Sequence, residues 1–330
     1  MRYKLTPHPR DHRDGRATTS ATPTSAAQAG LAGAADADWR QALELLFEHP
    51  SDAAALAWGR SYLQFAASGT FRCVLTKETA ETWLDCSLLR HPYFTVVLGD
   101  QAIPLPEVSS TRAVEGHTYD GFADGEKIRQ WFARGATLSI GALHDWHPPA
   151  QQLCRELGRR LSATATASVF WTAAGANGLR VHRDDAQVFI VQIAGTKTWQ
   201  LYDTPAAPGA WQPGYVDLTD LPAPTTLELR PGQALYLPEG LAHSATAQHE
   251  PTIHVTLAIR EPSLRDVMLL AVKACLASVP KHAVMGGSAV AREHAARELI
   301  GRLARALDRI DVAGLVASAG ASASRSGAGR

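Results

Sequence analysis

Between residues 162 and 259, short apolar segments alternate with Gly/Pro turns, and this pattern constrains the fold more than any other feature of the chain. Gln187–Ile193 reads as a buried strand, and Lys197–Tyr202 reads as a second strand after a glycine turn. A third short strand, Ala234–Leu237, follows the turn at Pro231. Short strands at this spacing are typical of an all-β barrel or sandwich. We therefore expect this region to form one β core.

His182 and Asp184 stand two residues apart beside this core, and His243 follows the third strand. On an extended chain, side chains two residues apart leave the same face, so His182 and Asp184 point together while Arg183 points away. Two imidazoles and one carboxylate are the ligand set that holds non-haem Fe(II) on one face. The sequence therefore predicts a metal site of His182, Asp184 and His243, with Arg183 in a structural salt bridge.

Lys197 begins the second strand of the core, where a lysine is usually directed to solvent. A buried ammonium is tolerated only when an anionic partner accompanies it. An enzyme that uses 2-oxoglutarate must neutralise the far carboxylate of this cosubstrate. We interpret Lys197 as the cation that does so.

The segment Phe170–Trp199 resembles the central motif of the JmjC/cupin-4 oxygenases, the group that contains the ribosomal oxygenases. Gly232–His243 and Thr252–Thr256 resemble the closing strands of that family. The resemblance covers about residues 40 to 310 and is specific at the three metal ligands and at Lys197. It implies Fe(II), 2-oxoglutarate and O2 as cofactors, and hydroxylation of a side chain. It also implies a mainly β, α+β fold with a double-stranded β-helix (jelly roll, cupin/JmjC) core, an N-terminal α/β elaboration and a C-terminal helical dimerisation region.

The chain departs from the family near the expected cosubstrate. Family members commonly carry Asn and Tyr two residues apart on the strand before the His-x-Asp motif, and Ser168 and Phe170 take these positions here. Serine keeps one hydroxyl, whereas phenylalanine has no hydrogen-bonding group. We expect Ser168 and Thr256 to contact the cosubstrate. Further candidates for the pocket are Phe170, Thr172, Gln192 and His254.

Composition agrees with a folded protein that has one large core and a smaller unit. The chain has 330 residues, of which 45% are hydrophobic and 19% charged, and its formal net charge is zero. Net neutrality gives no global electrostatic reason for nucleic-acid or membrane binding, so neither partner is expected. The four cysteines show no C-x-x-C spacing, so neither a zinc ribbon nor a disulfide framework is indicated. Reduced cytoplasm is the compartment that we expect.

The chain divides by composition into four parts. Residues 1–36 and 317–330 are rich in small and polar residues and are expected to be a disordered leader and tail. Residues 37–260 form the expected oxygenase domain, and residues 261–316 read as helical, with a homodimer forming through them. The helices expected from the periodicity are Trp39–Phe47, Ala53–Phe65, Lys77–Leu89 with Thr76 as N-cap, Glu126–Arg134, Pro149–Leu161, Ser263–Val279 and Ser288–Ile310. His144 and His147 lie at a helix entrance and are expected to be structural.

The substrate is open at this stage. A protein or peptide side chain is favoured, with ribosomal proteins as the nearest precedent by resemblance. Hydroxylation of a free amino acid or a natural-product intermediate is the alternative within enzymes. A non-catalytic JmjC-like binding module is the alternative of another class. A metal cupin that needs no cosubstrate would have no use for Lys197.

Overall fold

The computed structural model describes residues 37–50, 57–86, 88–203, 211–277, 287–312, 314–316 and 318–319. Contacts divide the chain into Met1–Ala37 and Asp38–Arg330, and only Ala37 of the first unit is described. The leader expected at residues 1–36 lies outside the described residues, as does nearly all of the tail expected at 317–330. The domain limits inferred from composition at these ends stay predictions.

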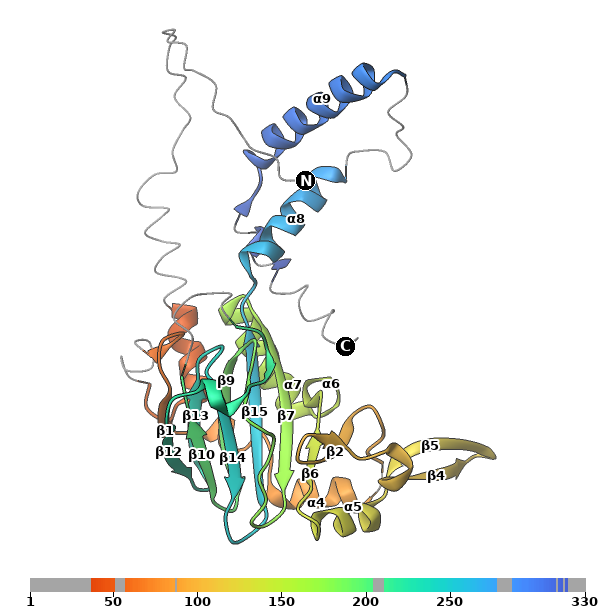
Figure 1. The fold of residues 1–330 in the computed structure, drawn as a ribbon, viewed down its shortest axis with the longest axis vertical. Coiled ribbons are helices and arrows are strands. Elements are labelled where there is room, and N and C mark those ends of the chain that lie inside the picture. Colours follow the sequence, from red (N-terminus) through yellow and green to blue (C-terminus); the bar gives the residue numbers. More distant parts are fainter. Residues whose placement is uncertain are drawn as a thin grey trace. The chain divides into compact units, whose positions relative to one another are not determined.

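Two antiparallel β-sheets form the centre of the described chain (Figure 1). The eight-stranded major sheet has the order β1 (Leu63–Ala66), β13 (Gln233–Leu237), β9 (Gln187–Ala194), β15 (Thr252–Arg260), β7 (Thr164–Thr172), β6 (Thr137–Ile140), β2 (Phe94–Leu98), β3 (Gln101–Ala102). The five-stranded minor sheet has the order β11 (Gly214–Tyr215), β8 (His182–Arg183), β14 (His243–Ala247), β10 (Lys197–Leu201), β12 (Thr225–Leu229). The strands from β7 to β15 form the jelly roll. The expected α+β fold with a jelly-roll core is therefore confirmed, whereas the dimerisation region stays a prediction.

One apolar core fills the space between the two sheets, and a larger one lies on the other face of the major sheet. Strand β9 contributes to both, because Val188 and Ile190 face the minor sheet while Phe189 and Val191 face the helices. A strand that is buried on both faces has no polar side to display. This explains why its sequence is a continuous apolar run rather than an alternating one.

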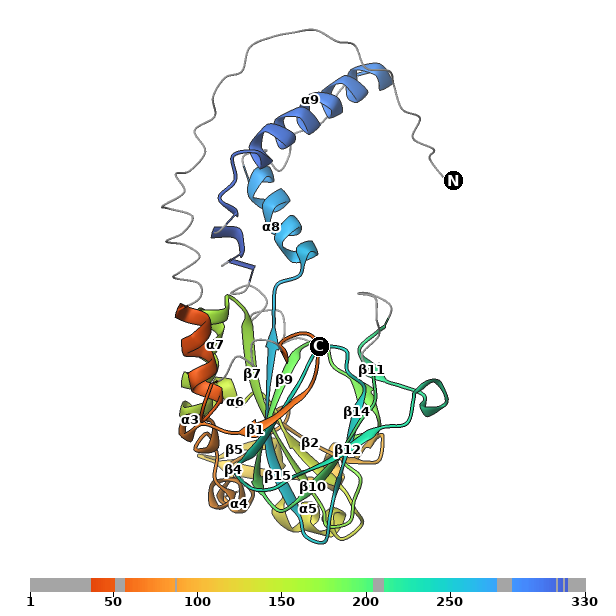
Figure 2. The ribbon, with the colours of Figure 1, turned by 90° about the vertical axis from the view of Figure 1, so that its left-hand side faces the viewer.

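Helices cover the outer face of the major sheet, on the side opposite the minor sheet (Figure 2). Helices α6 (Leu143–Trp146) and α7 (Pro148–Leu161) pack on β7, and α3 (Gly69–Arg72) packs on β9. Two further helices are α4 (Lys77–Asp85) and α5 (Gly125–Phe132). The hydroxyl of Thr76 accepts from the backbone N–H of Thr79, so the N-cap expected for α4 is confirmed.

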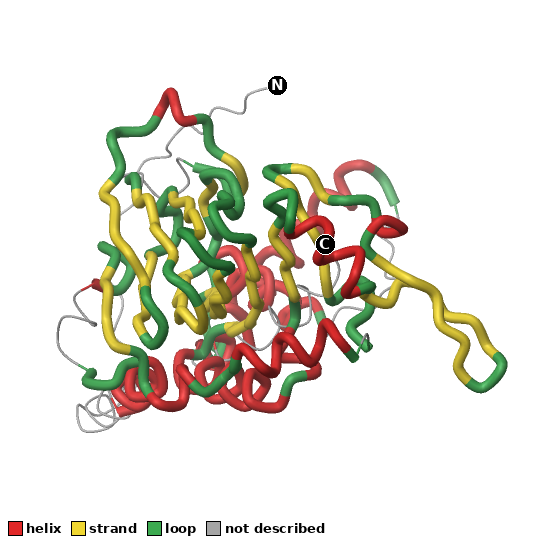
Figure 3. The backbone as a smooth tube through the Cα atoms, turned by 90° about the horizontal axis from the view of Figure 1, so that it is seen from below, coloured by secondary structure: helices red, strands yellow, loops and turns green. Residues whose placement is uncertain are grey.

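A hairpin of β4 (Ser109–Val114) and β5 (His117–Ala123) extends away from both sheets (Figures 1 and 3). Two short 3₁₀ helices, η1 (Leu105–Glu107) and η2 (Leu218–Asp220), are also present.

The helix expected over Ala53–Phe65 is wrong in its C-terminal half. Residues 53–56 lie outside the described residues, and Gly59 adopts a φ of +67°, which ends helical geometry. Strand β1 then pairs with β13 at the edge of the major sheet, from Leu63 opposite Tyr236 onwards. The ring of Phe65 stacks on Phe47 with the centroids 4.0 Å apart. Edge pairing and this contact prevail over the local helical propensity.

Helices α8 (Leu264–Leu276) and α9 (Ala289–Leu307) confirm the two helices expected after the jelly roll. Ser263 and Asp266 form a capping box at the start of α8, and Ser288 caps α9. The two helices contact each other. Among the described residues, no helix combines the length and the apolar character that crossing a bilayer requires.

Candidate metal and cosubstrate site

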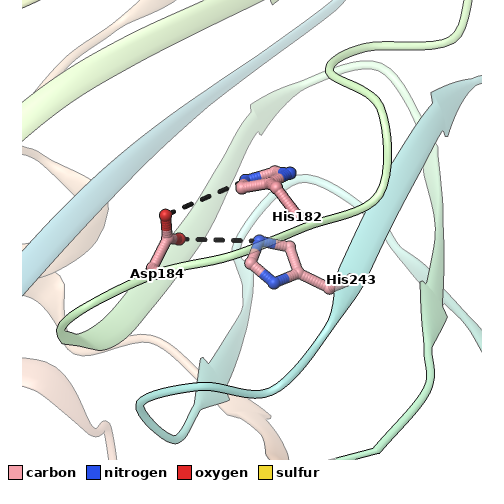
Figure 4. A group of neighbouring side chains, drawn as sticks. All are labelled: His182, Asp184 and His243. Atoms are coloured by element: carbon pink, nitrogen blue, oxygen red, sulfur yellow. Dashed lines mark ion pairs between the residues drawn. The ribbon is translucent and has the colours of Figure 1, made fainter. Parts of the chain in front are cut away.

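His182 and His243 are the first residues of β8 and β14, and the register of the minor sheet places them directly opposite each other. Asp184 follows immediately after β8. Its Oδ1 lies 3.9 Å from His182 Nε2, and its Oδ2 lies 3.7 Å from His243 Nε2 (Figure 4). Ligand atoms about 2.1 Å from a shared ion stand roughly 3 to 4 Å from one another. These three side chains therefore have the separation of a ligand set rather than that of hydrogen-bonded partners.

Backbone carbonyls fix the tautomers of both histidines. Nδ1 of His182 lies 2.7 Å from the carbonyl oxygen of Arg180, and Nδ1 of His243 lies 3.0 Å from that of Leu241. A carbonyl only accepts, so each Nδ1 carries the proton and each Nε2 keeps its lone pair toward Asp184. Burial, and then the neighbouring His182, lower the pKa of His243 to about 4. His243 is therefore a neutral imidazole near pH 7, as a metal ligand must be.

Arg183 points away from this group and links the two segments that carry it. Its guanidinium lies 2.9 Å from Asp203 Oδ1 and donates to the carbonyls of Asp203 and Gly240. The backbone N–H of Gly240 in turn donates to the carbonyl of Asp184. The expected structural salt bridge of Arg183 is confirmed. Its effect is to hold the turn before His243 against the segment that carries His182 and Asp184.

Lys197 is the first residue of β10, and its ammonium is buried rather than solvated. Nζ donates to Oγ1 of Thr172 at 3.0 Å and lies 3.4 Å from Nδ1 of His254. Within the described part of the chain, no carboxylate lies within ion-pair distance of it. Burial lowers the pKa of Lys197 to about 7. A buried ammonium with neutral neighbours is a binding position for an anion.

One cavity of about 280 Å³ joins the three metal-ligand candidates to Lys197. Inward-facing residues of β7 and β15 line its wall, as the period of two in each strand requires. Most of the other site residues expected from sequence line it as well, namely Ser168, Phe170, Thr172, His254 and Thr256.

Gln192 is the exception among the expected pocket residues. It is buried on the same face of β9 as Ile190, but its side-chain amide donates to the carbonyls of Ala194 and Gly195. It is not among the residues that line the cavity. The expectation for Gln192 is corrected, because the turn that follows β9 folds back onto this side chain.

Trp199 also lines the cavity, and it was not among the site residues expected from the sequence. Its indole N–H is buried and has no partner among the described residues. The ring lies beside the imidazoles of His243 and His254, at centroid distances of 6.0 and 5.4 Å. Trp199 lies two residues after Lys197 on β10, so both side chains leave the same face of the strand. This spacing could have identified Trp199 as a cavity residue.

His144 and His147 lie outside this cavity and have structural contacts, as expected. His147 Nε2 lies 2.8 Å from the carbonyl of Val74, and His144 Nδ1 accepts from the backbone N–H of Ala167. Both histidines therefore join the helical layer to neighbouring segments.

Residues 145–267 match the family model described as "JmjC domain". A Mus musculus protein named ribosomal oxygenase 2 is 30% identical over 159 residues, which cover 46% of this chain and 34% of that protein. A Drosophila grimshawi protein named bifunctional lysine-specific demethylase and histidyl-hydroxylase NO66 is 27% identical over 172 residues, covering 50% of this chain and 24% of that protein. The chain thus spans well under two thirds of the length of these relatives. The X-ray structure of E. coli ycfD superposes with a TM-score of 0.50 and 17% identity, covering 78% of this chain and 68% of that one, and it supports the fold.

Proposed function

We propose that this chain, whose residues 145–267 match a JmjC domain, is an Fe(II)- and 2-oxoglutarate-dependent oxygenase of the ribosomal-oxygenase-like type. The proposal rests on one cavity that contains both a possible metal-ligand set and a buried cation. It holds His182, Asp184 and His243 at metal-ligand separation, and it holds the ammonium of Lys197 without an anion.

The residues present fit these cofactors by their chemistry. Two imidazoles and one carboxylate are the facial ligand set that would hold non-haem Fe(II). The buried ammonium of Lys197 fits the distal carboxylate of a dicarboxylic acid whose keto-acid end reaches the metal. When bound, Fe(II), 2-oxoglutarate and O2 supply the oxidising chemistry that inserts one oxygen atom into an unactivated C–H bond.

The residues of the chain orient the metal ligands and the cosubstrate, and they exclude water from the cavity. The carbonyls of Arg180 and Leu241 hold the two imidazoles with Nε2 inward. Lys197 fixes the far end of the cosubstrate. The apolar side chains Val188 and Ile190 line the same cavity and keep water from the reacting C–H bond. Ser168 and Thr256 face each other across β7 and β15 in this cavity and offer hydroxyls to the cosubstrate.

A protein or peptide side chain is the proposed substrate. The cavity of about 280 Å³ lies at the small end of ligand pockets, which suits the cosubstrate together with one side chain. Relatives named ribosomal oxygenase and histidyl-hydroxylase support the same class, with a ribosomal protein favoured. A free amino acid or a natural-product intermediate is the alternative that the small cavity also accommodates.

The test is turnover of 2-oxoglutarate to succinate by the Fe(II)-loaded protein, together with mass spectrometry of cell-extract proteins for one added oxygen. His182→Ala is expected to abolish both metal binding and turnover. His144→Ala is the matched control, because this histidine lies outside the cavity. Full turnover by His182→Ala would contradict the site. A wild type that binds metal and 2-oxoglutarate without turnover in any extract would favour the non-catalytic binding module.

Two properties of the whole protein belong to the same proposal. A homodimer through α8 and α9 is supported by the exposed apolar side chains Leu264, Met268 and Leu269 on α8 and Val290 and Ile300 on α9. A cytoplasmic location is supported by the spacing of the four cysteines, which indicates no disulfide framework, and by the need for Fe(II).

A further inference from the structure

Around Lys197, the cavity wall holds more hydrogen-bond donors than acceptors among the described residues use. Thr137 donates its hydroxyl to Oγ1 of Thr172 at 3.2 Å, and Lys197 donates to the same oxygen at 3.0 Å. With both lone pairs of Thr172 occupied, its own hydroxyl hydrogen has to be donated elsewhere. Thr137, Thr172 and Lys197 all line the cavity, so the unused donors of Thr172 and Lys197 are available at its wall.

His254 belongs to the same group. It lies on β15, opposite Phe170 of β7, and its ring stacks on Phe170 with the centroids 5.2 Å apart and an angle of 17°. Burial, and then the charge of Lys197, lower the pKa of His254 well below its ordinary value, so the ring is neutral. Nδ1 lies 3.4 Å from the ammonium of Lys197, which can only donate when charged. A neutral imidazole that accepts at Nδ1 carries its proton on Nε2.

The tautomer of His254 is therefore opposite to that of the two metal-ligand candidates. His182 and His243 carry the proton on Nδ1, held by carbonyls, and keep a lone pair on Nε2. His254 offers an N–H where they offer a lone pair. It is suited to an anion rather than to a cation.

We propose that His254 is a second anchor for the distal carboxylate of the cosubstrate, donating from Nε2 while its Nδ1 accepts from Lys197. The inference rests on the proposed use of 2-oxoglutarate. Phe170, on which the imidazole stacks, has no hydrogen-bonding group of its own and keeps the ring in place. The edge of Trp199, at a centroid distance of 5.4 Å and an angle of 72°, limits rotation of the imidazole from another side. The pair of Lys197 and His254 selects for an acid that carries a carboxylate at its far end.

The experiment measures binding without turnover, by calorimetry on the Mn(II)-loaded protein. The two probes are 2-oxoglutarate and 2-oxopentanoate, which have the same chain length and the same keto-acid end but differ in the distal carboxylate. His254→Phe retains an aromatic ring against Phe170 and removes both ring nitrogens. We expect this variant to bind 2-oxoglutarate about 10 to 100-fold more weakly, because one charge-assisted hydrogen bond is lost. Its affinity for 2-oxopentanoate should equal that of the wild type.

His254→Gln is the conservative variant, since its amide can accept from Lys197 and donate to a carboxylate. It is expected to retain 2-oxoglutarate affinity within about threefold of the wild type. An equal loss for both probes in His254→Phe, or no loss for 2-oxoglutarate, overturns the role of His254. A wild type that binds neither acid overturns the proposed function instead, so the two failures are distinguishable.

The role of His254 can also be tested by NMR on the wild type, which does not depend on whether a variant folds. In the Zn(II)-loaded protein with nitrogen-15 in its histidines, 2-oxoglutarate is expected to shift the Nε2 resonance of His254 and to slow exchange of its proton. 2-Oxopentanoate is expected to do neither. An Nε2 resonance that is unmoved by saturating 2-oxoglutarate overturns the proposal.

Discussion

Lys197 is the residue whose environment says most about what the cavity binds. Its two close polar neighbours, Thr172 and His254, are neutral, so no charge within the described chain offsets the ammonium. A buried charge without a counter-charge lowers the stability of the fold and raises the affinity for an anion that supplies one. Both consequences can be measured on the same variant.

Replacing Lys197 by Met removes the buried ammonium and keeps an apolar chain of similar length. Without 2-oxoglutarate, we expect this variant to be more stable than the wild type by about 1 to 3 kcal/mol in urea unfolding at pH 7. With saturating 2-oxoglutarate, the wild type is expected to gain stability and the variant to gain almost none. Lys77→Met, at an exposed position paired with Glu81, is the control that should change neither quantity. A loss of stability in Lys197→Met would contradict the unpaired state of this lysine.

Affinity for 2-oxoglutarate is expected to fall as pH rises above 7. The pKa of Lys197 in the empty cavity is about 7, so at higher pH the site has to take up a proton when the dicarboxylate binds. The apparent affinity should decrease by up to tenfold per pH unit until the higher pKa of the occupied site is reached. Calorimetry in buffers of different ionisation enthalpy reports the proton uptake directly. Lys197→Arg keeps its charge and should show a flat profile, and a flat profile in the wild type would refute this prediction.

At the scale of elements, the turn between β9 and β10 determines where Lys197 lies relative to β15. Gly195 in this turn has a φ of +66°, and a Cβ built there would lie 2.5 Å from the carbonyl oxygen of Pro251. The turn is therefore pressed against the start of β15, which carries His254. Only a residue without a Cβ allows this close approach.

Gly195→Ala is expected to destabilise the protein by about 3 kcal/mol or more and to weaken 2-oxoglutarate binding, because the turn has to move away from Pro251. Gly116→Ala is the matched control. Gly116 also has a positive φ, +80°, but its Cβ would meet nothing within 4 Å, so only about 1 kcal/mol of backbone strain is expected. Equal losses in the two variants, measured by urea unfolding, would show that the contact with Pro251 is unimportant.

At the scale of the whole molecule, α8 and α9 present apolar side chains that nothing in the described chain covers. Leu264 is 86% exposed, Met268 68% and Val290 77%. Such residues on neighbouring helices are characteristic of an interface between copies of one chain. The jelly roll has its own two cores and does not depend on these helices for burial.

Met268→Glu combined with Leu269→Glu is expected to convert a dimer into a monomer at micromolar concentration, as measured by light scattering after size exclusion. The charges would have to be buried without partners in the dimer. Leu218→Glu is the control, since this leucine is 58% exposed on η2 and should leave the mass unchanged. A wild type that is monomeric across the accessible concentration range would contradict the dimer.

The local parts of this protein were readable from its sequence because each depends on short-range geometry. The spacing of His182 and Asp184 follows from the period of a strand, and the N-cap of α4 follows from the Thr76 side chain meeting a nearby backbone N–H. Strands β9, β10 and β13 were recognised from apolar runs between turns.

Only the tertiary structure decided which distant segments meet. The antiparallel pairing of β8 with β14 sets His243 opposite His182, and the pairing of β15 with β7 sets His254 against Phe170 beside Lys197. Leu63–Ala66 became a strand only because β13 offered it an open edge. Gln192 turned from the cavity because the carbonyls of the following turn accept its amide. Strand pairing is decided by the free energy of the whole sheet. That free energy depends on segments far apart in the sequence, so it cannot be read from neighbouring residues alone.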